Sequence, residues 1–329
     1  MEIILGLKKF HKNRYKKPFV LTIGNFDGVH LAHQKIIKTT IRRAKFLNGT
    51  SIIVTFFPHP LKILQPEKKI ALLTDNDHKL ELIAKLKPDL CLVIKFQKLF
   101  AKIKPEKFLK EIIKHVLSPA EIVVGRKFNF GENKSGDINY LKKIGEFIGY
   151  KVKIVPPLIR GDAVISSTLI RQIVAFGDLY RASLMLGWEF SITGIVKSAD
   201  KRGRALGFPT ANIDSSQEAL PPTGVYAARI KLANRFYHGM LNIGTRPTFY
   251  PQADNVCIEV NIFNFKRDIY GQRIKIIPIQ KLRKEKKFSS SSLLQKQLRR
   301  DKKSAEVILR EYSQTQLVCS QSFTTQNIQ

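Results

Sequence analysis

Short apolar runs and longer stretches with helical spacing alternate along the first half of the chain. The apolar run over residues 19–23 predicts a buried strand, and the spacing over residues 31–46 predicts a helix. Further strands are expected over residues 51–57, 90–94, 121–124 and 150–155, and further helices over residues 80–86, 105–116 and 139–148. Strands separated by helices of this length indicate parallel crossovers, so we expect an α/β domain with a doubly wound parallel sheet.

The pattern changes after residue 186, where strand-like runs follow one another with few helices between them. A helical stretch over residues 167–186 stops at Gly187. The strands expected beyond it lie over residues 192–196, 224–232, 237–243, 256–263 and 274–279. This order predicts an antiparallel barrel, followed by a helix over residues 289–312.

Length and pattern together indicate two domains. The chain has 329 residues, which is enough for two cores of ordinary size. We expect an α/β domain over residues 1–186 and a mainly β domain over residues 187–312. Residues 313–329 are rich in Ser, Thr and Gln, so we expect them to form a disordered tail.

The charge of the chain is strongly unbalanced. Its 57 Lys and Arg residues face 26 Asp and Glu residues, which gives a formal net charge of +31. Such a balance favours anionic partners: nucleic acid, an acidic membrane surface or phosphorylated small molecules. The basic residues are dispersed, however, and the densest group, over residues 281–287, is interrupted by Glu285. Compositional bias on a solvated surface therefore explains the charge more readily than a dedicated polyanionic partner.

Other features of the composition argue against a membrane protein or a disulfide-stabilised one. No apolar run approaches the roughly 20 residues of a membrane span. Cys91, Cys257 and Cys319 are far apart and form no C-x-x-C pair, which indicates neither a disulfide framework nor a zinc site. We therefore expect a soluble protein of the reducing cytoplasm, and the sequence does not predict its oligomeric state.

The strongest sign of chemistry lies between the first predicted strand and the first predicted helix. Residues 24–33 read G-N-F-D-G-V-H-L-A-H and contain His30 and His33. Free backbone N–H groups and the helix dipole converge at such a turn and suit an anion, and both imidazoles can donate hydrogen bonds to phosphate. Segments that can converge on the same pocket are T-F-F-P-H-P at 55–60, the loop over 124–137 and I-S-S-T-L-I-R at 165–171. The first domain is therefore predicted to handle phosphate, on a nucleotide.

A second candidate site lies in a basic, glycine-bearing loop that ends with F-P-T-A-N over residues 208–212. Thr210 and Asn212 are two residues apart on an extended segment, so their side chains face the same side. Both carry the oxygen ligands that Mg²⁺ prefers. The alternative is a hairpin loop in which Pro209 and Asn212 serve only the turn.

These motifs occur in an order that resembles a known enzyme family. G-x-F-D-G-x-H-x-x-H, F-F-P-H-P, V-G-x-x-F-x-F-G and S-S-T-x-x-R resemble the FAD synthetase module of prokaryotic bifunctional riboflavin kinase/FAD synthetases, over residues 1–186. G-R-x-L-G-F-P-T-A-N, P-P-x-G-V-Y-A, N-I-G-x-R-P-T-F and L-R-x-E-x-K-F resemble riboflavin kinase over residues 187–302. For the second domain the resemblance implies a six-stranded antiparallel barrel.

The resemblance implies a two-step synthesis of flavin cofactors. The second domain would transfer the γ-phosphate of ATP to the 5′-hydroxyl of riboflavin, with Mg²⁺ as metal cofactor, and so form FMN. The first domain would join FMN to the AMP part of ATP and release pyrophosphate. Riboflavin, FMN and ATP are therefore the expected partners.

The resemblance also implies roles for individual residues of the first domain. His30 and His33 would bind the triphosphate, and Arg171 would hold the phosphates from the opposite side. Phe128 would contact the flavin. The other nucleotide-binding residues implied are Gly24, Phe26, Asp27, Gly28, Ser167 and Thr168.

In the second domain, the implied roles concern the metal, the base and the flavin. Thr210 and Asn212 would hold Mg²⁺, and Glu259 would act as general base on the riboflavin hydroxyl. Arg283 would belong to a flap near the flavin. The phosphate-binding residues implied there are Gly203, Arg204 and Gly207.

Two departures from the family pattern keep other functions open. Ala32 stands where the family usually has glycine, and Lys127 stands where an acidic residue or Asn is usual. The first alternative is therefore a riboflavin kinase whose first domain has lost its activity. The second is a basic nucleic-acid-binding protein, which the dispersed distribution of Lys and Arg disfavours.

Overall fold

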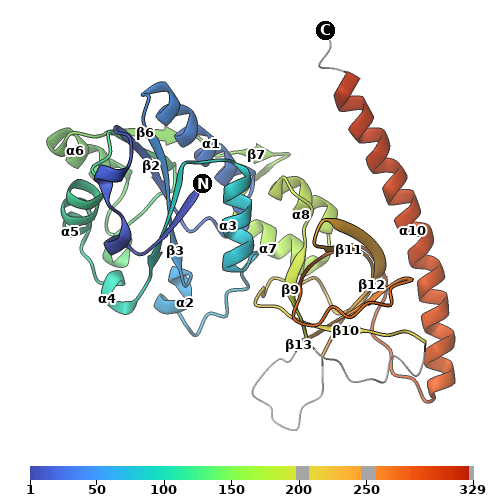
Figure 1. Ribbon diagram of the computed structural model, residues 1–329. Coiled ribbons are helices and arrows are strands. Elements are labelled where there is room, and N and C mark those ends of the chain that lie inside the picture. The colour runs from blue at the N-terminus through green and yellow to red at the C-terminus, as the bar shows by residue number, and fades with distance from the viewer. Residues whose placement is uncertain (198–206, 246–255, 326–329) are drawn as a thin grey trace. The chain divides into compact units, whose positions relative to one another are not determined.

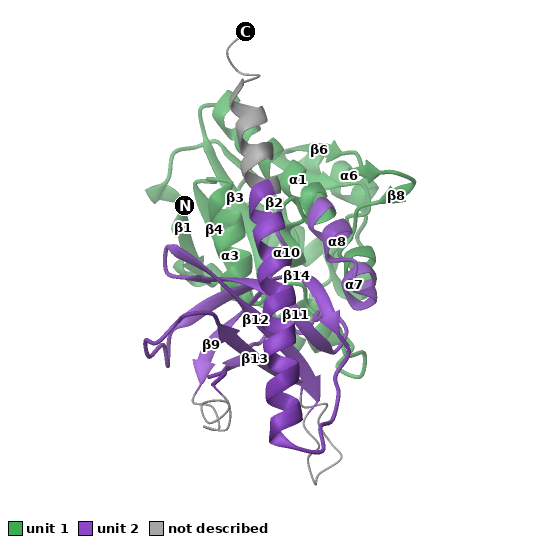
Figure 2. Ribbon diagram, turned by 90° about the vertical axis from the view of Figure 1, so that its right-hand side faces the viewer, with its two compact units in different colours: residues 1–171, 185–187 green, residues 172–184, 188–329 purple. Residues whose placement is uncertain are grey.

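The computed structural model describes residues 1–197, 207–245 and 256–325, and of residues 315–325 only the backbone (Figure 1). Two compact units make up the chain, coloured separately in Figure 2. The first unit comprises residues 1–171 and 185–187, and the second comprises residues 172–184 and 188–329. Each unit is described by itself.

The first unit is built on a six-stranded parallel sheet with the order β1-β4-β3-β2-β5-β6, which confirms the doubly wound sheet. Its strands are β1 (Glu2–Leu5), β2 (Phe19–Ile23), β3 (Thr50–Phe57), β4 (Leu90–Lys95), β5 (Glu121–Gly125) and β6 (Lys151–Val155). The strand order reverses between β2 and β5. In such sheets ligands bind at the carboxyl ends of the strands beside the reversal, so the loops after Ile23 and Gly125 open onto the expected ligand site.

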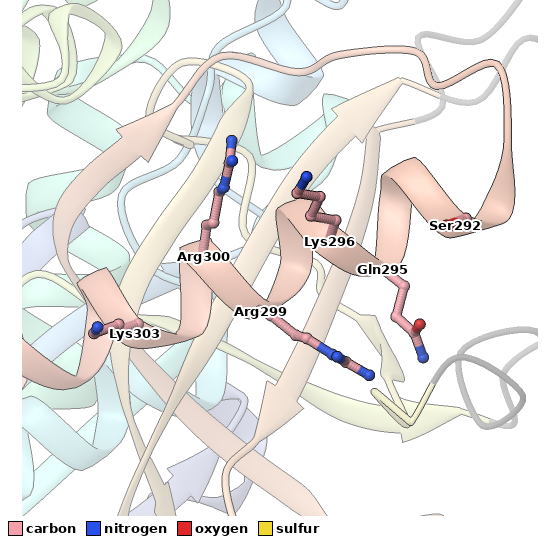
Figure 3. A pocket seen from close by; sticks show the side chains of 6 residues that line it. All are labelled: Ser292, Gln295, Lys296, Arg299, Arg300 and Lys303. Carbon is pink, nitrogen blue, oxygen red and sulfur yellow. The ribbon is translucent and has the colours of Figure 1, made fainter.

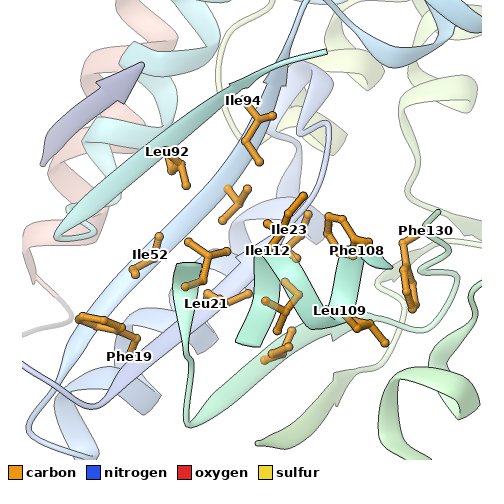
Figure 4. Close-up of a cluster of buried hydrophobic side chains, with 14 of the residues drawn as sticks. Phe19, Leu21, Ile23, Ile52, Leu92, Ile94, Phe108, Leu109, Ile112 and Phe130 are labelled. Carbon is orange, nitrogen blue, oxygen red and sulfur yellow. The ribbon is translucent and has the colours of Figure 1, made fainter. Parts of the chain in front are cut away.

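Helices pack on both faces of this sheet. The helices of the first unit are α1 (Leu31–Phe46), α2 (Pro60–Leu64), α3 (Asn76–Lys85), α4 (Lys98–Ala101), α5 (Pro105–Lys107) with its π-helical continuation Phe108–Leu117, and α6 (Ile138–Ile148). Successive side chains of β2 point to opposite faces. Leu21 belongs to the large buried cluster that contains Phe108 (Figure 4), whereas Val20 is buried with Ala44 of α1. A hairpin, β7 (Ile159–Arg160) and β8 (Ala163–Val164), precedes α7 (Ser167–Phe176) and α8 (Leu179–Leu186).

The second unit is a closed six-stranded antiparallel barrel with the order β10-β13-β12-β11-β14-β9, as the family resemblance implies. Its strands are β9 (Ile192–Lys197), β10 (Ala211–Asp214), β11 (Gly224–Leu232), β12 (Arg235–Thr245), β13 (Val256–Ile262) and β14 (Arg273–Arg283). Because β9 pairs with both β10 and β14, the barrel is closed and no described strand is left as an edge with unpaired backbone groups. Ile230, Leu241 and Ile276 are fully buried in this barrel.

Helix α10 (Ser291–Thr325) presents two different sides. Ala305 and Leu309 are buried in one cluster with Val225 of β11 and Met240 of β12. The other side carries the basic residues in Figure 3, where an open groove is lined by Ser292, Gln295, Lys296, Arg299, Arg300 and Lys303. None of these four cations forms an ion pair with an acidic side chain of the described residues. The helix thus presents four cations from eight consecutive residues, 296–303, along one groove.

The structure contains elements that the pattern along the chain does not predict. The strands β1 and β10 have four residues each, which is too short to show an alternating pattern. The helix expected over residues 167–186 is two helices, because Gly177 adopts φ +94° and ends α7. Within the described part of the chain, no helix combines the length and the apolar character needed to cross a bilayer.

The end of the chain also differs from the expectation. Helix α10 continues to Thr325, so the segment expected as a disordered tail over residues 313–329 is helical as far as the structure describes it. Residues 313–325 contain neither Pro nor Gly. Nothing in their composition therefore ends a helix that has already begun at Ser291.

Candidate active sites

The turn between β2 and α1 is shaped by three residues with positive φ, the last of which is Val29 at φ 36°. Phe26 lies in the left-handed region at φ 50°, and Gly28 follows at φ 76° in a short 3-10 segment, Asp27–Val29. A Cβ at Gly28 would lie 2.8 Å from the Leu73 side chain, so glycine is required there by space as well as by conformation. The turn delivers His30 to the N-cap position of α1, at the carboxyl edge of the sheet.

His30 and His33 form a stacked pair at this position. Their ring centroids are 3.6 Å apart with an interplanar angle of 15°, and the Phe26 ring packs edge-on against His33 at 5.3 Å. Nδ1 of His30 accepts a hydrogen bond from the backbone N–H of His33 at 3.3 Å, so the neutral ring carries its proton on Nε2. Nδ1 of His33 is buried without a partner among the described residues. Nε2 of His30 is therefore left to donate to a ligand, and Nδ1 of His33 remains an unsatisfied buried nitrogen.

Both histidines are neutral at physiological pH. Burial lowers the pKa of His30 to about 4, and the positive charge of Arg171 acts in the same direction. Burial and the neighbouring His30 also bring the pKa of His33 well below its usual value. The pair can therefore bind phosphate as hydrogen-bond donors, and a formal positive charge at the site has to come from other residues.

Asp27 holds three separate segments together. Its buried carboxylate accepts hydrogen bonds from the backbone N–H groups of Leu73 at 3.0 Å and Thr74 at 3.3 Å, and it pairs with Nη2 of Arg171 at 2.8 Å. The Ser167 hydroxyl donates to the backbone carbonyl of Asp27 at 2.9 Å. The structure thus brings together the histidine turn, the start of α7 and the segment before α3. The last of these carries no motif and is missed by sequence reasoning.

Arg171 is only partly used by this pairing. Its Nε is buried and has no hydrogen-bond partner in the described part of the chain. Thr168 is exposed in the first turn of α7, where Ser166 caps the helix by accepting from the N–H of Leu169 at 3.3 Å. A guanidinium held on one side and open on the other suits a phosphate that approaches from the helix start.

The remaining candidates of the first unit lie at the neighbouring strand ends. Phe128 follows β5 and stacks on Phe130 at 5.7 Å, at the margin of the large hydrophobic core. Lys127 beside it is exposed. His59 follows β3 and caps α2, with Nδ1 accepting from the N–H of Leu61 at 3.2 Å. Ala32 occupies the first turn of α1.

In the second unit, strand register brings the candidate residues together. Asn212 of β10 pairs with Glu259 of β13, and Glu259 pairs in turn with Asn242 of β12. Residues directly opposite each other in a ladder face the same side of the sheet, so these three share one surface of the barrel. The Oδ1 atom of Asn212 is buried without a partner among the described residues. Thr210 comes two positions earlier, and Pro209 is tied to β13 by Nδ2 of Asn261, which donates to its carbonyl at 2.7 Å.

Glu259 and Arg283 have different surroundings. The Cys257 thiol donates to Oε1 of Glu259 at 3.4 Å. Arg283, at the end of β14, places Nε and Nη2 each 2.8 Å from Oδ2 of the buried Asp301 on α10, so its guanidinium links the barrel to that helix. Gly207 is exposed with φ 75°, and Gly203 and Arg204 lie outside the described residues.

Comparisons with known proteins agree with this division into two sites. A family model described as FAD synthetase matches residues 12–169, and one described as riboflavin kinase matches residues 186–309. A solved structure described as a macrolide-efflux protein from Streptococcus pneumoniae is similar over 93% of this chain and 99% of its own, with a TM-score of 0.80 and 27% identity.

Relatives named bifunctional riboflavin kinase/FMN adenylyltransferase are similar over most of the chain. The protein of Buchnera aphidicola subsp. Schizaphis graminum is 35% identical, covering 92% of this chain and 96% of its own length. That of Bacillus subtilis is 37% identical, with coverages of 87% and 91%, and that of Escherichia coli K12 is 34% identical, with the same coverages. Similarity of this extent through both units shows that the chain belongs to the bifunctional riboflavin kinase/FMN adenylyltransferase family.

Proposed function

We propose that the second unit phosphorylates riboflavin to FMN and that the first unit adenylylates FMN to FAD, each with ATP. The observation that carries this proposal is the match of two enzyme families, one in each unit, around the two residue sets described above. We assign the adenylyltransferase domain to residues 1–186 and the kinase domain to residues 187–312, with residues 172–184 of the first span packed in the second unit. Cys91 and Cys257 form no disulfide within the described residues, which is in keeping with a reducing cytoplasm.

In the adenylyltransferase, the FMN phosphate oxygen attacks the α-phosphorus of ATP. A new P–O–P linkage forms, the bond to the β-phosphate oxygen breaks, and pyrophosphate leaves with the bonding electron pair. No protein nucleophile is required, so the residues only align and stabilise the anions. His30 donates through Nε2, His33 through the ring nitrogen that carries its proton, and Arg171 through the N–H groups that Asp27 leaves free.

The turn around these donors and the loop after β5 complete the proposed site. Gly24 and Gly28 allow the backbone to approach the nucleotide, while Phe26 and Asp27 hold the turn in shape. Ser167 and Thr168 lie at the start of α7, where free N–H groups favour phosphate. Phe128 offers a partly exposed ring beside β5, which suits the flat flavin.

In the kinase, Glu259 accepts the proton of the riboflavin 5′-hydroxyl as the hydroxyl oxygen attacks the γ-phosphorus of ATP. The bond between that phosphorus and the β,γ-bridging oxygen breaks, and ADP leaves with the bonding electron pair. The unpartnered, buried Oδ1 of Asn212 and the hydroxyl of Thr210 fit a hard cation, so we assign these two residues to hold Mg²⁺. The bound ion would neutralise charge between the phosphates. Gly203, Arg204 and Gly207 would contact the phosphates, and Arg283 positions the segment after β14 near the flavin.

A product assay tests the whole proposal. The protein is incubated with riboflavin, ATP and Mg²⁺, and flavins are separated by chromatography. We expect FMN to appear first and FAD to follow. FMN without FAD would support the kinase-only alternative, and neither product would refute both activities.

Matched variants assign each step to its unit. His30→Ala should stop FAD formation and leave FMN formation intact. Asn212→Ala should stop FMN formation while supplied FMN is still converted to FAD. Loss of both steps in either variant would contradict the assignment of the two reactions to separate sites.

A further inference from the structure

Lys79 is a buried cation that the proposed mechanism does not use. It lies on α3, only 7% exposed, and its Nζ donates to the backbone carbonyl of Phe56 at 3.0 Å. Phe56 is near the end of β3, directly before the F-P-H-P loop at the ligand edge of the sheet. No carboxylate of the described residues pairs with Lys79 within ion-pair distance. Burying the charge of a lysine in this way costs folding free energy unless an opposite charge compensates it.

The groups that face Lys79 do not cancel its charge. The Cys91 thiol faces it from β4, and burial raises the pKa of that thiol to about 12, so Cys91 is uncharged. The Asp27 carboxylate acts on it from the histidine turn, but Asp27 is already paired with Arg171 at 2.8 Å. His30 and His33 are neutral. The two cations, Lys79 and Arg171, and the single carboxylate of Asp27 therefore leave a surplus of one positive charge under the turn.

We propose that Lys79 is a positioning residue of the adenylyltransferase, whose charge under the histidine turn is balanced by the triphosphate of bound ATP. The inference rests on the proposed function of the first unit. It explains how neutral histidines can form an anion site, because the attraction over distance comes from the lysine near Asp27 of the same turn and the directed hydrogen bonds come from the imidazoles.

The purely structural role of Lys79 is to hold the Phe56 carbonyl, and a neutral donor can do that. Lys79→Gln keeps a donor and removes the charge, Lys79→Met removes both, and Lys79→Arg keeps the charge. Lys85→Gln, an exposed position on the same helix, is the matched control. Because Lys79 has no ion-pair partner among the described residues, a neutral side chain in its place leaves no opposite charge buried alone.

The decisive measurement is the KM for ATP in the conversion of supplied FMN to FAD. We expect Gln and Met to raise this KM equally, on the order of tenfold, and Arg and the Lys85 control to leave it close to that of the unaltered protein. The kinase reaction should be unchanged in all variants. KM does not depend on the concentration of folded enzyme, so partial unfolding of a variant does not blur the comparison.

The pH dependence adds a signature that a structural role would not produce. Burial lowers the pKa of Lys79, against the opposing influence of Cys91 and Asp27. The lysine is charged below that lowered pKa, so the KM of the unaltered protein should begin to rise at a pH below the usual lysine pKa of about 10.4. The Gln and Met variants should lack this rise, and the ratio of variant to unaltered KM should fall toward one.

Several results would overturn the proposal. Rescue by Gln would show that only the hydrogen bond to Phe56 matters, and failure of Arg to preserve the KM would show that charge is not the property required. A ratio of variant to unaltered KM that stays constant across the pH range would also show that the charge of Lys79 is not the property required. If the unaltered protein forms no FAD from FMN, the proposed function itself fails, which is a separate outcome.

Discussion

The two sites of this protein are built in different ways. In the first unit, loops from separate strands and helices meet at the edge of a parallel sheet, and the buried carboxylate of Asp27 ties three of them together. In the second unit, Asn212, Glu259 and Asn242 are aligned by the register of adjacent antiparallel strands. A loop-built site depends on a few polar contacts, whereas a ladder-built site depends on the whole barrel. Substitutions in the loop-built site and in the ladder-built site should therefore differ in their effects on activity and on the free energy of unfolding.

The largest effect is expected in the ladder-built site. Glu259→Gln keeps the shape of the side chain and removes the base, so the kinase kcat should fall by about 10²–10⁴-fold, with the barrel still folded. Glu306→Gln, in an exposed i,i+4 pair on α10, is the control. Steady-state phosphorylation of riboflavin measures the effect. A kcat within twofold of the unaltered value would remove Glu259 from the mechanism.

In the loop-built site, a residue that need not touch the substrate should matter nearly as much. Asp27→Asn leaves Arg171 as a largely buried cation, 19% exposed, without a counter-ion, which should cost the first unit about 3 kcal/mol in free energy of unfolding. The rate of FAD formation should fall as the first unit loses stability, while FMN formation in the second unit continues. Asp137→Asn is the matched control, because Asp137 is an exposed N-cap and Asn caps equally well.

Hydrogen exchange of peptides from residues 1–171 reports the stability of the first unit alone. Equal protection from hydrogen exchange in the Asp27 and Asp137 variants would mean that the Asp27 carboxylate is not needed to hold the three segments together.

Acid should weaken the loop-built unit through its neutral histidines. The pKa of His30 is about 4 in the folded chain and about 6.5 when exposed, so the unfolded chain binds the extra proton first. The stability of the first unit should therefore fall as pH decreases from about 6.5 to about 4, by about 3 kcal/mol from His30 alone. The same hydrogen-exchange measurement, repeated across pH, gives the slope.

His30→Gln should reduce this pH dependence, and substitution of the exposed His115 should not. An unchanged slope in the His30 variant would show that this histidine is not held neutral.

The smallest effect is expected where the chain departs from its family. Ala32 is in the first turn of α1, so Ala32→Gly should lower the stability of the first unit by about 0.5 kcal/mol and leave the kcat for FAD formation within twofold. A large increase in FAD formation would instead mean that Ala32 obstructs the nucleotide.

Sequence patterns predict well where the signal is local. The apolar run of β2, the glycine turn and the spacing of α1 predict the strand over residues 19–23 and the helix over residues 31–46 with the bounds that the structure has. The short β10 is hidden inside a motif, since four residues show no periodicity. The backbone donors of Leu73 and Thr74 leave no trace in the sequence, because every residue has an N–H. Lys79 reads as one more solvated lysine until the fold buries it.

The division of the chain between its units limits how such a gene could be split. Residues 172–184 belong to the second unit, although the motif at 165–171 that precedes them belongs to the first. Ser183 accepts a hydrogen bond from the N–H of Phe190 at 2.9 Å, and Val174 and Ala182 are fully buried. A kinase gene that started at codon 187 would leave the barrel without this segment. Independent expression of the two activities, and so independent control of the cellular ratio of FMN to FAD, requires more than a single cut between them.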